Sequence, residues 1–365
     1  MTSEKSGQDT VWSSLEGQSV KVPNLLNLLS SGEVKAKLHP EYEKARDEAL
    51  NPWIRRYVDN DESCRALQQD EFGLFAAVIC ADAPYDKLCT VAKFFAWYYL
   101  WDDLFDFDTL KNESIHGMGD NRRISIEYIQ HQILPSKNVR PDFSSYPLQL
   151  QKALMSWDEI GVHVRDVCSE ETRELLCKEM VDYMSSVGGV NALFDGGKRP
   201  TLEEYWERRD RDAGVYPGIA TIPFVAGIDV TAQDVGGRQM EETWKQASYV
   251  VHIVNDMISL HKELDDGQIE NLISILILNE SISVNDALQE AYQLAEKNYT
   301  GLKNSASALE SDDSEYSQPV SSAFARGCVD LVKGVLYWSY NGGRYLEGGK
   351  LDEENVFHFQ ITKRS

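Results

Sequence analysis

Four long segments without proline dominate this sequence and limit the folds it can adopt. Residues 86–105, 170–187, 241–264 and 284–302 are too long for typical strands and fit α-helices. The chain has 11 prolines, and most lie between candidate helices, where their missing backbone N–H does no harm. Alternating runs of β-branched residues are few. The pattern predicts an all-α protein of about ten helices.

The two chain ends differ from the helical region between them. Residues 1–20 are polar and mixed in charge, which predicts a flexible N-terminal tail. We expect a second tail at residues 351–365 and a single helical domain over residues 21–350. Residues 304–319 are rich in Ser, Asp and Glu and predict a mobile loop within that domain.

The chain is strongly acidic, with a formal net charge of -23. Such a charge repels nucleic acid and anionic membranes, so we expect no nucleic-acid partner. A phosphorylated ligand would need a local cluster of cations or recruited metal ions. No segment approaches the ~20 apolar residues of a membrane span, and the N-terminus lacks the apolar stretch of a signal peptide. A cytoplasmic protein is therefore expected.

An aromatic run, FFAWYYLW, ends in an acidic cluster, DDLFD, at residues 102–106. Asp102 and Asp106 are four residues apart, so on a helix they share one face. Two carboxylates this close favour a shared cation, and carboxylate oxygens suit Mg²⁺. Phe95, Tyr98 and Tyr99 lie on roughly the same stripe, one or two turns earlier. The helix predicts a metal-bound anion at the mouth of a site and an apolar chain below it.

Two other interpretations of this cluster remain open. It can be the solvated acidic end of an amphipathic helix. Alternatively, the sequence DFDT that starts at Asp106 is similar to the first motif of haloacid-dehalogenase-type phosphatases. That motif needs a buried β-strand directly before it, whereas the run upstream of Asp106 is long and unbroken.

A second polar stripe lies about 150 residues further on, in the sequence NDMISLHKE. Asn255, Ser259 and Glu263 follow one another at intervals of four, and each step drifts only about 40° around a helix. They present an amide oxygen, a hydroxyl and a carboxylate, which are hard oxygen ligands. Lys262 lies beside them and can reach a metal-bound anion. The alternative is a hydrogen-bond network between buried helices.

Together, DDLFD and NDMISLHKE resemble the metal-binding pair of microbial class I terpene synthases, in particular sesquiterpene cyclases of the fungal type. The resemblance implies a helical bundle around a central cavity, where both motifs hold three Mg²⁺ ions against an isoprenyl diphosphate. It implies Asp102 as the leading ligand of the first motif, with Asp106 more variable in the family. Asn255, Ser259 and Glu263 would hold a further ion.

Residues 205–214, YWERRDRDAG, concentrate three arginines in this acidic chain, and the arginine fork fits phosphate oxygens. We call Asn255, Ser259 and Glu263 the triad. The family carries a diphosphate-sensing arginine 46 residues before the first residue of its triad, and in this sequence Arg209 occupies that position. By the same resemblance, Asp212 is the linker and Ala213 the effector, acting through its carbonyl. Gly214 and the residues after it predict a helix break that directs partial negative charge into the cavity. A surface ion-pair cluster is the alternative.

Near the C-terminus, the sequence WSYNGGRY resembles the closing Arg-Tyr pair of the same family, here Arg344 and Tyr345. Both side chains can donate to diphosphate. The double glycine before them predicts a loosened segment, and a frayed helix end is the alternative. By position, five aromatic residues are expected to line the cavity, although core packing is the alternative for each: Phe75, Phe95, Tyr98, Tyr99 and Trp338.

The resemblance implies Mg²⁺-dependent ionisation of a linear isoprenyl diphosphate and cyclisation of the carbocation to a terpene hydrocarbon or alcohol. Such an enzyme is a carbon–oxygen lyase acting on phosphates. Charge must be stabilised on the departing diphosphate, and the cation needs apolar and aromatic walls that exclude water. Farnesyl diphosphate is the favoured substrate, while a C20 substrate, the product skeleton and a homodimer remain open.

Three other functions compete with cyclisation. A prenyl chain-elongating synthase usually carries a second DDxxD motif, which this sequence lacks. A non-catalytic helical binding protein could keep the fold, although every expected metal position has an oxygen ligand. The third is the phosphatase suggested by DFDT. A protonation-initiated cyclase is not favoured, because no DxDD motif is present.

Overall fold

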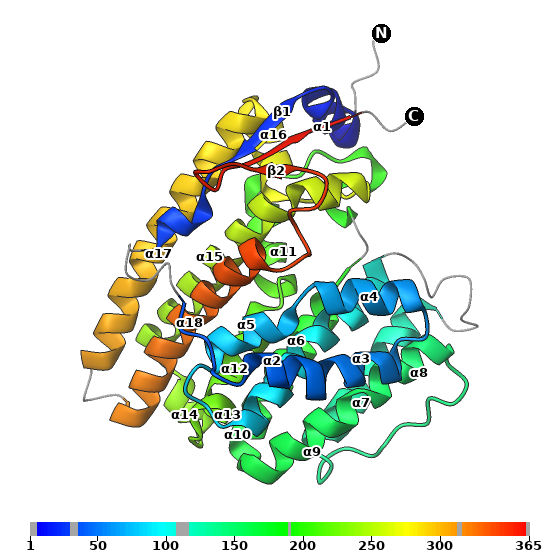
Figure 1. Cartoon of the computed structure of the whole chain (residues 1–365), viewed down its shortest axis with the longest axis vertical. Helices are drawn as coiled ribbons and strands as arrows, with labels where there is room; N and C mark the ends of the chain where they lie inside the picture. The colour runs from blue at the N-terminus through cyan, green and yellow to red at the C-terminus, as the bar shows by residue number, and fades with distance from the viewer. Residues whose placement is uncertain (1–5, 30–35, 107–116, 189–190, 312–315, 363–365) are drawn as a thin grey trace.

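The computed structural model describes residues 6–29, 36–106, 117–188, 191–311 and 316–362, except for the side chain of Asp106. These residues form a helical bundle with one small sheet (Figure 1). The long helices are α6 (Tyr85–Asp106), α7 (Met118–Ile133), α10 (Glu170–Ser186), α15 (Arg238–Asp265), α17 (Val284–Ser311) and α18 (Gln318–Asn341).

Shorter helices connect and cover the long ones, so the described residues hold more helices than the ten or so predicted. The α-helices among them are α1 (Gly7–Leu15), α2 (Tyr42–Lys44), α3 (Asn51–Tyr57), α4 (Asp61–Gln69), α5 (Phe72–Ile79), α8 (Leu148–Met155), α9 (Trp157–Val167), α11 (Leu202–Asp212), α12 (Val215–Ala220), α13 (Ile222–Ala226), α14 (Ala232–Val235) and α16 (Leu272–Glu280). Three further turns of helix are η1 (Leu25–Leu28), η2 (Ala45–Leu50) and η3 (Ala192–Gly197).

The long helices agree with the proline-free segments, with one correction. Helices α6, α10 and α15 match their predicted ranges to within a few residues. Helix α17, however, continues to Ser311, and α18 begins at Gln318, so the predicted loop at residues 304–319 is wrong for residues 304–311 and 318–319. Buried Leu302, Ala306 and Leu309 continue the apolar stripe of α17 through this Ser-rich stretch. Residues 312–315 lie outside the described part of the chain.

Both predicted tails are wrong for the residues described, because they pair with each other. Strand β1 (Ser19–Val22) runs antiparallel to β3 (Phe357–Gln360), and β2 (Lys350–Leu351) pairs with the other edge of β3. Val20 and Phe357 are buried, and α1 before the sheet buries Val11. The alternating apolar residues of these short strands are too few to predict strands within the polar segments at the chain ends. Figure 1 shows the N-terminal and C-terminal strands side by side.

One apolar core extends from α1 to β3 and includes residues of every long helix. Helix α15 packs along α17, and α18 packs against α5, α15 and α17. This arrangement places α18 beside α5, which packs on α6, and it places α12 between α10 and both α15 and α18. None of the described helices is both long and apolar enough to span a bilayer.

Candidate active site

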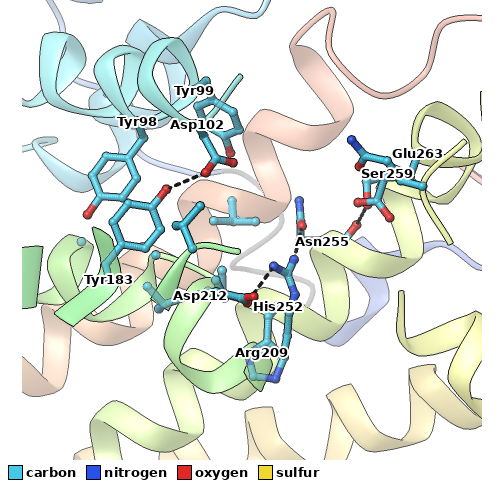
Figure 2. Close-up of a pocket in the computed structure, with 18 of the residues that line it drawn as sticks. Tyr98, Tyr99, Asp102, Tyr183, Arg209, Asp212, His252, Asn255, Ser259 and Glu263 are labelled. Atoms are coloured by element: carbon cyan, nitrogen blue, oxygen red, sulfur yellow. Dashed lines mark hydrogen bonds and ion pairs between the residues drawn. The ribbon is translucent and has the colours of Figure 1, made fainter. Parts of the chain in front are cut away.

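A cavity of about 240 Å³ lies among α5, α6, α10, α11, α12, α15 and α18. Asp102 approaches it from α6, and the triad approaches from α15 on the opposite side (Figure 2). The two oxygen-rich faces therefore meet at one hollow. The predicted site residues that line it are Phe75, Phe95, Tyr98, Tyr99, Asp102, Arg209, Asp212, Ala213, Asn255, Ser259, Lys262, Glu263, Trp338, Arg344 and Tyr345.

The first acidic cluster lies at the C-terminal end of α6. Tyr183 Oη donates a 3.2 Å hydrogen bond to Asp102 Oδ1. Burial, together with the charge of Asp103, raises the pKa of Asp102 to about 7. Asp103 also lines the cavity, and its Oδ1 lies 3.9 Å from Arg344 Nη2. The cluster thus holds two carboxylates whose charge is poorly compensated by the protein.

Asp106 belongs to the last turn of α6, but its side chain lies outside the described part of the structure. The following residues of the DFDT motif, 107–109, lie outside it as well. The chain is helical from Tyr85 through Asp106, whereas the phosphatase motif needs a buried strand there. The phosphatase interpretation is therefore wrong, since its motif requires the extended backbone that α6 excludes.

The triad forms a continuous polar stripe on α15. Ser259 Oγ lies 2.6 Å from Glu263 Oε1, and Asn271 Nδ2 donates to Glu263 Oε2 at 2.8 Å. Asn255 Nδ2 donates to Tyr345 Oη at 3.0 Å. Burial, reinforced by the nearby charge of Asp256, raises the pKa of Glu263 to about 7. The stripe confirms the helical geometry predicted from the spacing.

The donor set of the two helices suits a hard divalent cation. Asp102, Asn255, Ser259 and Glu263 line the cavity, and the atoms through which their side chains can bind a metal are oxygens, as Mg²⁺ prefers. Among the described residues, no three His, Cys, Asp or Glu side chains form a group that could hold a metal ion. The ligands are instead divided between two helices and include an amide and a hydroxyl. Such a set fits ions that bind together with phosphate oxygens of a ligand.

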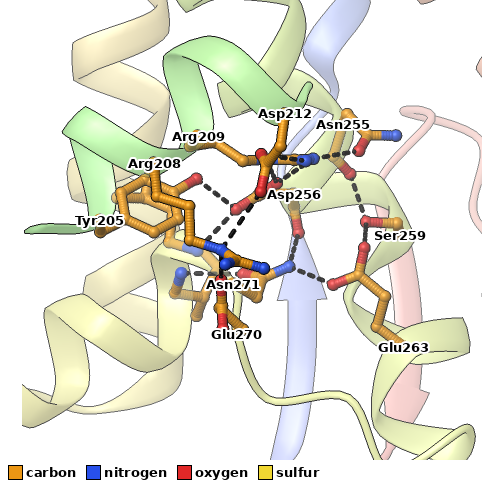
Figure 3. A network of polar contacts seen from close by, with 12 residues as sticks. Tyr205, Arg208, Arg209, Asp212, Asn255, Asp256, Ser259, Glu263, Glu270 and Asn271 are labelled. Carbon is orange, nitrogen blue, oxygen red and sulfur yellow. Dashed lines mark hydrogen bonds and ion pairs between the residues drawn. The ribbon is translucent and has the colours of Figure 1, made fainter. Parts of the chain in front are cut away.

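Arg209 is anchored beside the first residue of the triad (Figure 3). Its Nη2 donates to Asn255 Oδ1 at 2.9 Å, and its Nε and Nη2 donate to Asp256 Oδ1 at 3.2 and 2.9 Å. The other carboxylate oxygen of Asp256 accepts from Tyr205 Oη at 2.5 Å and from the backbone N–H of Leu272 at 2.6 Å. Asp256 therefore fixes the guanidinium independently of Asn255.

Asp212 connects two neighbouring arginines at the end of α11. Its Oδ1 lies 3.6 Å from Arg209 Nη1, and its Oδ2 lies 3.2 Å from Arg208 Nε. Helix α11 ends there, Ala213 caps it, and Gly214 adopts the left-handed conformation with φ 68° before α12 begins. The predicted helix break is confirmed, and it places Ala213 on the cavity wall.

The remaining two cationic side chains predicted for the site, Lys262 and Arg344, come from α15 and from the segment that follows α18. Lys262 Nζ pairs with Asp266 Oδ2 at 2.9 Å on α15. The Arg344 guanidinium lies 4.2 Å from the ring centroid of Tyr99 and donates to Asp70 Oδ2 at 2.7 Å. In a chain this acidic, four basic side chains nevertheless line the cavity, which are Arg208, Arg209, Lys262 and Arg344.

The five predicted aromatic residues line the cavity, and all of them except Tyr98 also pack on one another. The Phe75 ring lies 4.2 Å from Phe95 and 5.6 Å from Trp338, centroid to centroid. The Tyr99 ring lies 5.7 Å from Trp338. Core packing and cavity lining are thus not alternatives here, because these residues belong to the apolar core, or pack against it, and also line the cavity.

Several polar residues of the site were missed in the sequence. Asp103 and Asp256 directly follow Asp102 and Asn255, so their adjacency was an available signal. Other missed partners lie on elements with no recognisable motif, and only the fold brings them to the site. They are Asp70, Tyr183, Glu270 and Asn271.

Two oxygen-rich helix faces across a cavity in an all-α bundle define the class I terpenoid synthase fold. A linalool/nerolidol synthase from Streptomyces clavuligerus, solved with 2-fluorogeranyl diphosphate, superposes with a TM-score of 0.66. The two share 18% sequence identity, over 83% of this chain and 99% of that one. At this identity the superposition supports the fold alone.

Comparison of the sequence with known proteins identifies the family as well as the fold. The model for terpene synthase family 2, C-terminal metal binding, matches residues 93–300, and the chain belongs to this family. Terpene cyclase braA of Annulohypoxylon truncatum is 24% identical, over 93% of this chain and 89% of its own length. Sesquiterpene cyclase hepA of Aspergillus oryzae is 26% identical, over 67% and 66%. The chain is a class I terpene synthase of the fungal type.

Proposed function

We propose that this enzyme uses Mg²⁺ to ionise a linear isoprenyl diphosphate and cyclises the resulting carbocation, with farnesyl diphosphate as the favoured substrate. The observation that carries the proposal is one cavity with Asp102 on one side, the Asn255 triad on the other, and aromatic walls between. The names of similar proteins, a sesquiterpene cyclase and a synthase bound to a fluorinated geranyl diphosphate, support this substrate class.

Three Mg²⁺ ions are proposed at the two oxygen-rich faces. Asp102 would contribute on α6, together with Asp106 at the end of that helix. Asn255, Ser259 and Glu263 would hold a further ion on α15. Bound Mg²⁺ would neutralise charge on the departing diphosphate and so lower the barrier to ionisation. The proposal rests on the oxygen-only donor set and on the family's description as metal binding.

Four side chains are proposed to bind the diphosphate directly: Arg209, Lys262, Arg344 and Tyr345. Each lines the cavity and carries N–H or O–H donors suited to phosphate oxygens. The ion pair of Arg209 with Asp212 would then pass a shift of the arginine to Ala213 at the helix break. This is the sensor, linker and effector sequence implied by the family resemblance.

The walls of the cavity account for the fate of the carbocation. Phe95, Tyr98 and Trp338 present aromatic faces, which attract cations without being strong nucleophiles. Apolar walls also exclude water, so the cation survives long enough to cyclise. The C–O bond breaks heterolytically, and its electron pair leaves with the diphosphate. Loss of a proton from the final carbocation would give a hydrocarbon, and capture of one water molecule with loss of a proton would give an alcohol.

The decisive experiment is incubation of the purified protein with Mg²⁺ and geranyl, farnesyl or geranylgeranyl diphosphate, with analysis by mass spectrometry. We expect cyclic C15 products from farnesyl diphosphate and one diphosphate released per product, with both abolished by EDTA. Consumption of isopentenyl diphosphate into longer chains would instead identify an elongating synthase. Substrate binding without metal-dependent diphosphate release would identify a non-catalytic binding protein.

A further inference from the structure

The corner between α4 and α5 contacts the segment that carries Arg344. Gly343 N donates to Gln69 O at 3.0 Å, and Trp338 Nε1 donates to Asp70 O at 2.5 Å. Arg344 Nη1 donates to Asp70 Oδ2 at 2.7 Å. Three bonds therefore join residues that lie far apart in the sequence, and one of them ends on a proposed diphosphate ligand.

The double glycine before Arg344 makes this contact possible. A Cβ on Gly342 would lie 2.9 Å from Asp70 O, and a Cβ on Gly343 would lie 2.7 Å from Gln69 O. Either distance is too short for a real side chain. The glycines thus allow close backbone approach to the corner, which corrects the prediction that they loosen the segment.

Arg344 is held on several sides, yet one of its donors is unused. Its side chain and that of Asp70 are 12% and 13% exposed. Its guanidinium lies over the ring of Tyr99, and its Nη2 lies 3.9 Å from Asp103 Oδ1. Its Nε is buried and has no hydrogen-bond partner among the described residues. Arg344 is thus fixed by the protein and also lines the cavity, where a ligand can contact its guanidinium.

We propose that Asp70 is a positioning residue, which holds Arg344 in the orientation that receives the substrate diphosphate. This inference rests on the proposed function. A free arginine side chain loses many rotamers when it binds a ligand, and the bond to Asp70 restricts them beforehand. A buried ion pair contributes little net stability, so its main physical effect here is on geometry. For this role, the affinity gained by orienting Arg344 must exceed the affinity lost through repulsion between the Asp70 carboxylate and the incoming anion.

The test is a double-mutant cycle on the binding of inorganic diphosphate in the presence of Mg²⁺, measured by calorimetry on the full chain. We expect Asp70→Ala to weaken binding about tenfold, as losing the partner of a ligand residue does at metal sites. In an Arg344→Ala background the same change should have less than a twofold effect. Asp70→Asn should weaken binding less than Asp70→Ala, because its amide oxygen still accepts from Arg344.

Glu71→Gln is the matched control at the same corner. Glu71 accepts from Tyr42 Oη and lies 3.6 Å from Arg46 Nη1, and it does not line the cavity. We expect this variant to lower the thermal midpoint without changing diphosphate affinity. It therefore separates a loss of corner stability from a loss of arginine orientation.

Two results would overturn the positioning role. One is an Asp70→Ala or Asp70→Asn affinity equal to or tighter than wild type, which would mean that charge repulsion dominates. The other is a loss of diphosphate affinity on Asp70→Ala that is equally large in the wild-type and Arg344→Ala backgrounds. If wild type and Glu71→Gln both fail to bind diphosphate with Mg²⁺, the proposed function fails too. If wild type binds and turns over substrate while Asp70→Ala binds equally well, only the positioning role fails.

Discussion

At the residue scale, the half-buried carboxylates of Asp102 and Glu263 are adapted to a ligand more than to the free protein. Burial raises the pKa of each to about 7. An acid with a raised pKa in the folded state stabilises the fold when protonated. That stability is fully present below the pKa of the unfolded chain and is lost as the pH rises towards 7. At neutral pH, ionisation of these groups therefore destabilises the protein without bound cations.

Asp102→Asn should thus stabilise the free protein while it removes activity. We expect a thermal midpoint higher by about 2 °C at pH 7.5, because the amide carries no charge to desolvate. We also expect at least ~100-fold slower diphosphate release, since a charged oxygen ligand is lost. Calorimetry and a diphosphate assay test both. Asp82→Asn, at an exposed pair with Lys37, is the control and should change neither. Turnover at the wild-type rate in Asp102→Asn would count against the site.

Asn255→Ala should abolish turnover while the fold persists. The change removes the amide oxygen of a residue that lines the cavity, but Arg209 keeps two hydrogen bonds to Asp256. We expect a loss of at least ~100-fold in kcat and a thermal midpoint within about 2 °C of wild type. Product yield and circular dichroism measure the two. A variant that is unfolded, or one that retains product formation, contradicts this prediction.

At the element scale, the break between α11 and α12 depends on Gly214. Its φ of 68° favours glycine, and a Cβ there would lie 3.0 Å from Tyr98 Cε1 and 3.2 Å from Tyr183 Cε2. Both rings line the cavity, so the break and the wall share one packing contact. A single residue thus sets the direction of α12 and the position of a wall aromatic.

Gly214→Ala should therefore change both stability and product distribution. The left-handed conformation costs an alanine about 1 kcal/mol, and displacement of Tyr98 adds to it. Gly17→Ala is the matched control, because φ is 74° there and no atom lies within 4 Å of the added Cβ. We expect the control to lose only the backbone contribution and to keep the wild-type product ratio. Identical products from both variants would show that the contact with Tyr98 does not shape the cavity.

At the scale of the whole molecule, the sheet of β1, β2 and β3 ties the two chain ends to the helix that carries the triad. The ring of His261 on α15 lies 4.7 Å from that of Phe359 on β3. The chain reaches this sheet directly after Arg344 and Tyr345. The N-terminal strand therefore restrains the segment that supplies two proposed diphosphate ligands.

Val20→Asp should release this restraint. Val20 is fully buried opposite Phe359, so a carboxylate there costs at least ~2 kcal/mol. Hydrogen exchange should become faster in residues 346–361, as the β1–β3 pairing opens. Lys21→Asp is the control, because this neighbouring side chain is exposed and the change should stay within about 0.5 kcal/mol. Equal rates of hydrogen exchange in the two variants would contradict this restraint and support the predicted flexible tails instead.

The sequence by itself determined the helices and the local geometry of both motifs. The spacing of Asn255, Ser259 and Glu263 places them on one stripe wherever α15 lies, because helical periodicity is a property of neighbouring residues. The resemblance to terpene synthases then predicted the fold and the cavity-lining positions. The sequence did not predict the strands at the chain ends, because their pairing depends on residues far apart in the chain.

Only the tertiary structure decided which carboxylates hold the arginine side chains of the site in place. Arg209 is anchored by Asp256, 47 positions away, and Arg344 by Asp70, 274 positions away. No local pattern predicts that either arginine pairs with its carboxylate, because each pairing depends on how whole helices pack. Tertiary packing also set the burial that raises the pKa of Asp102 and Glu263. Desolvation is a property of the folded surroundings, so no spacing in the sequence could predict it.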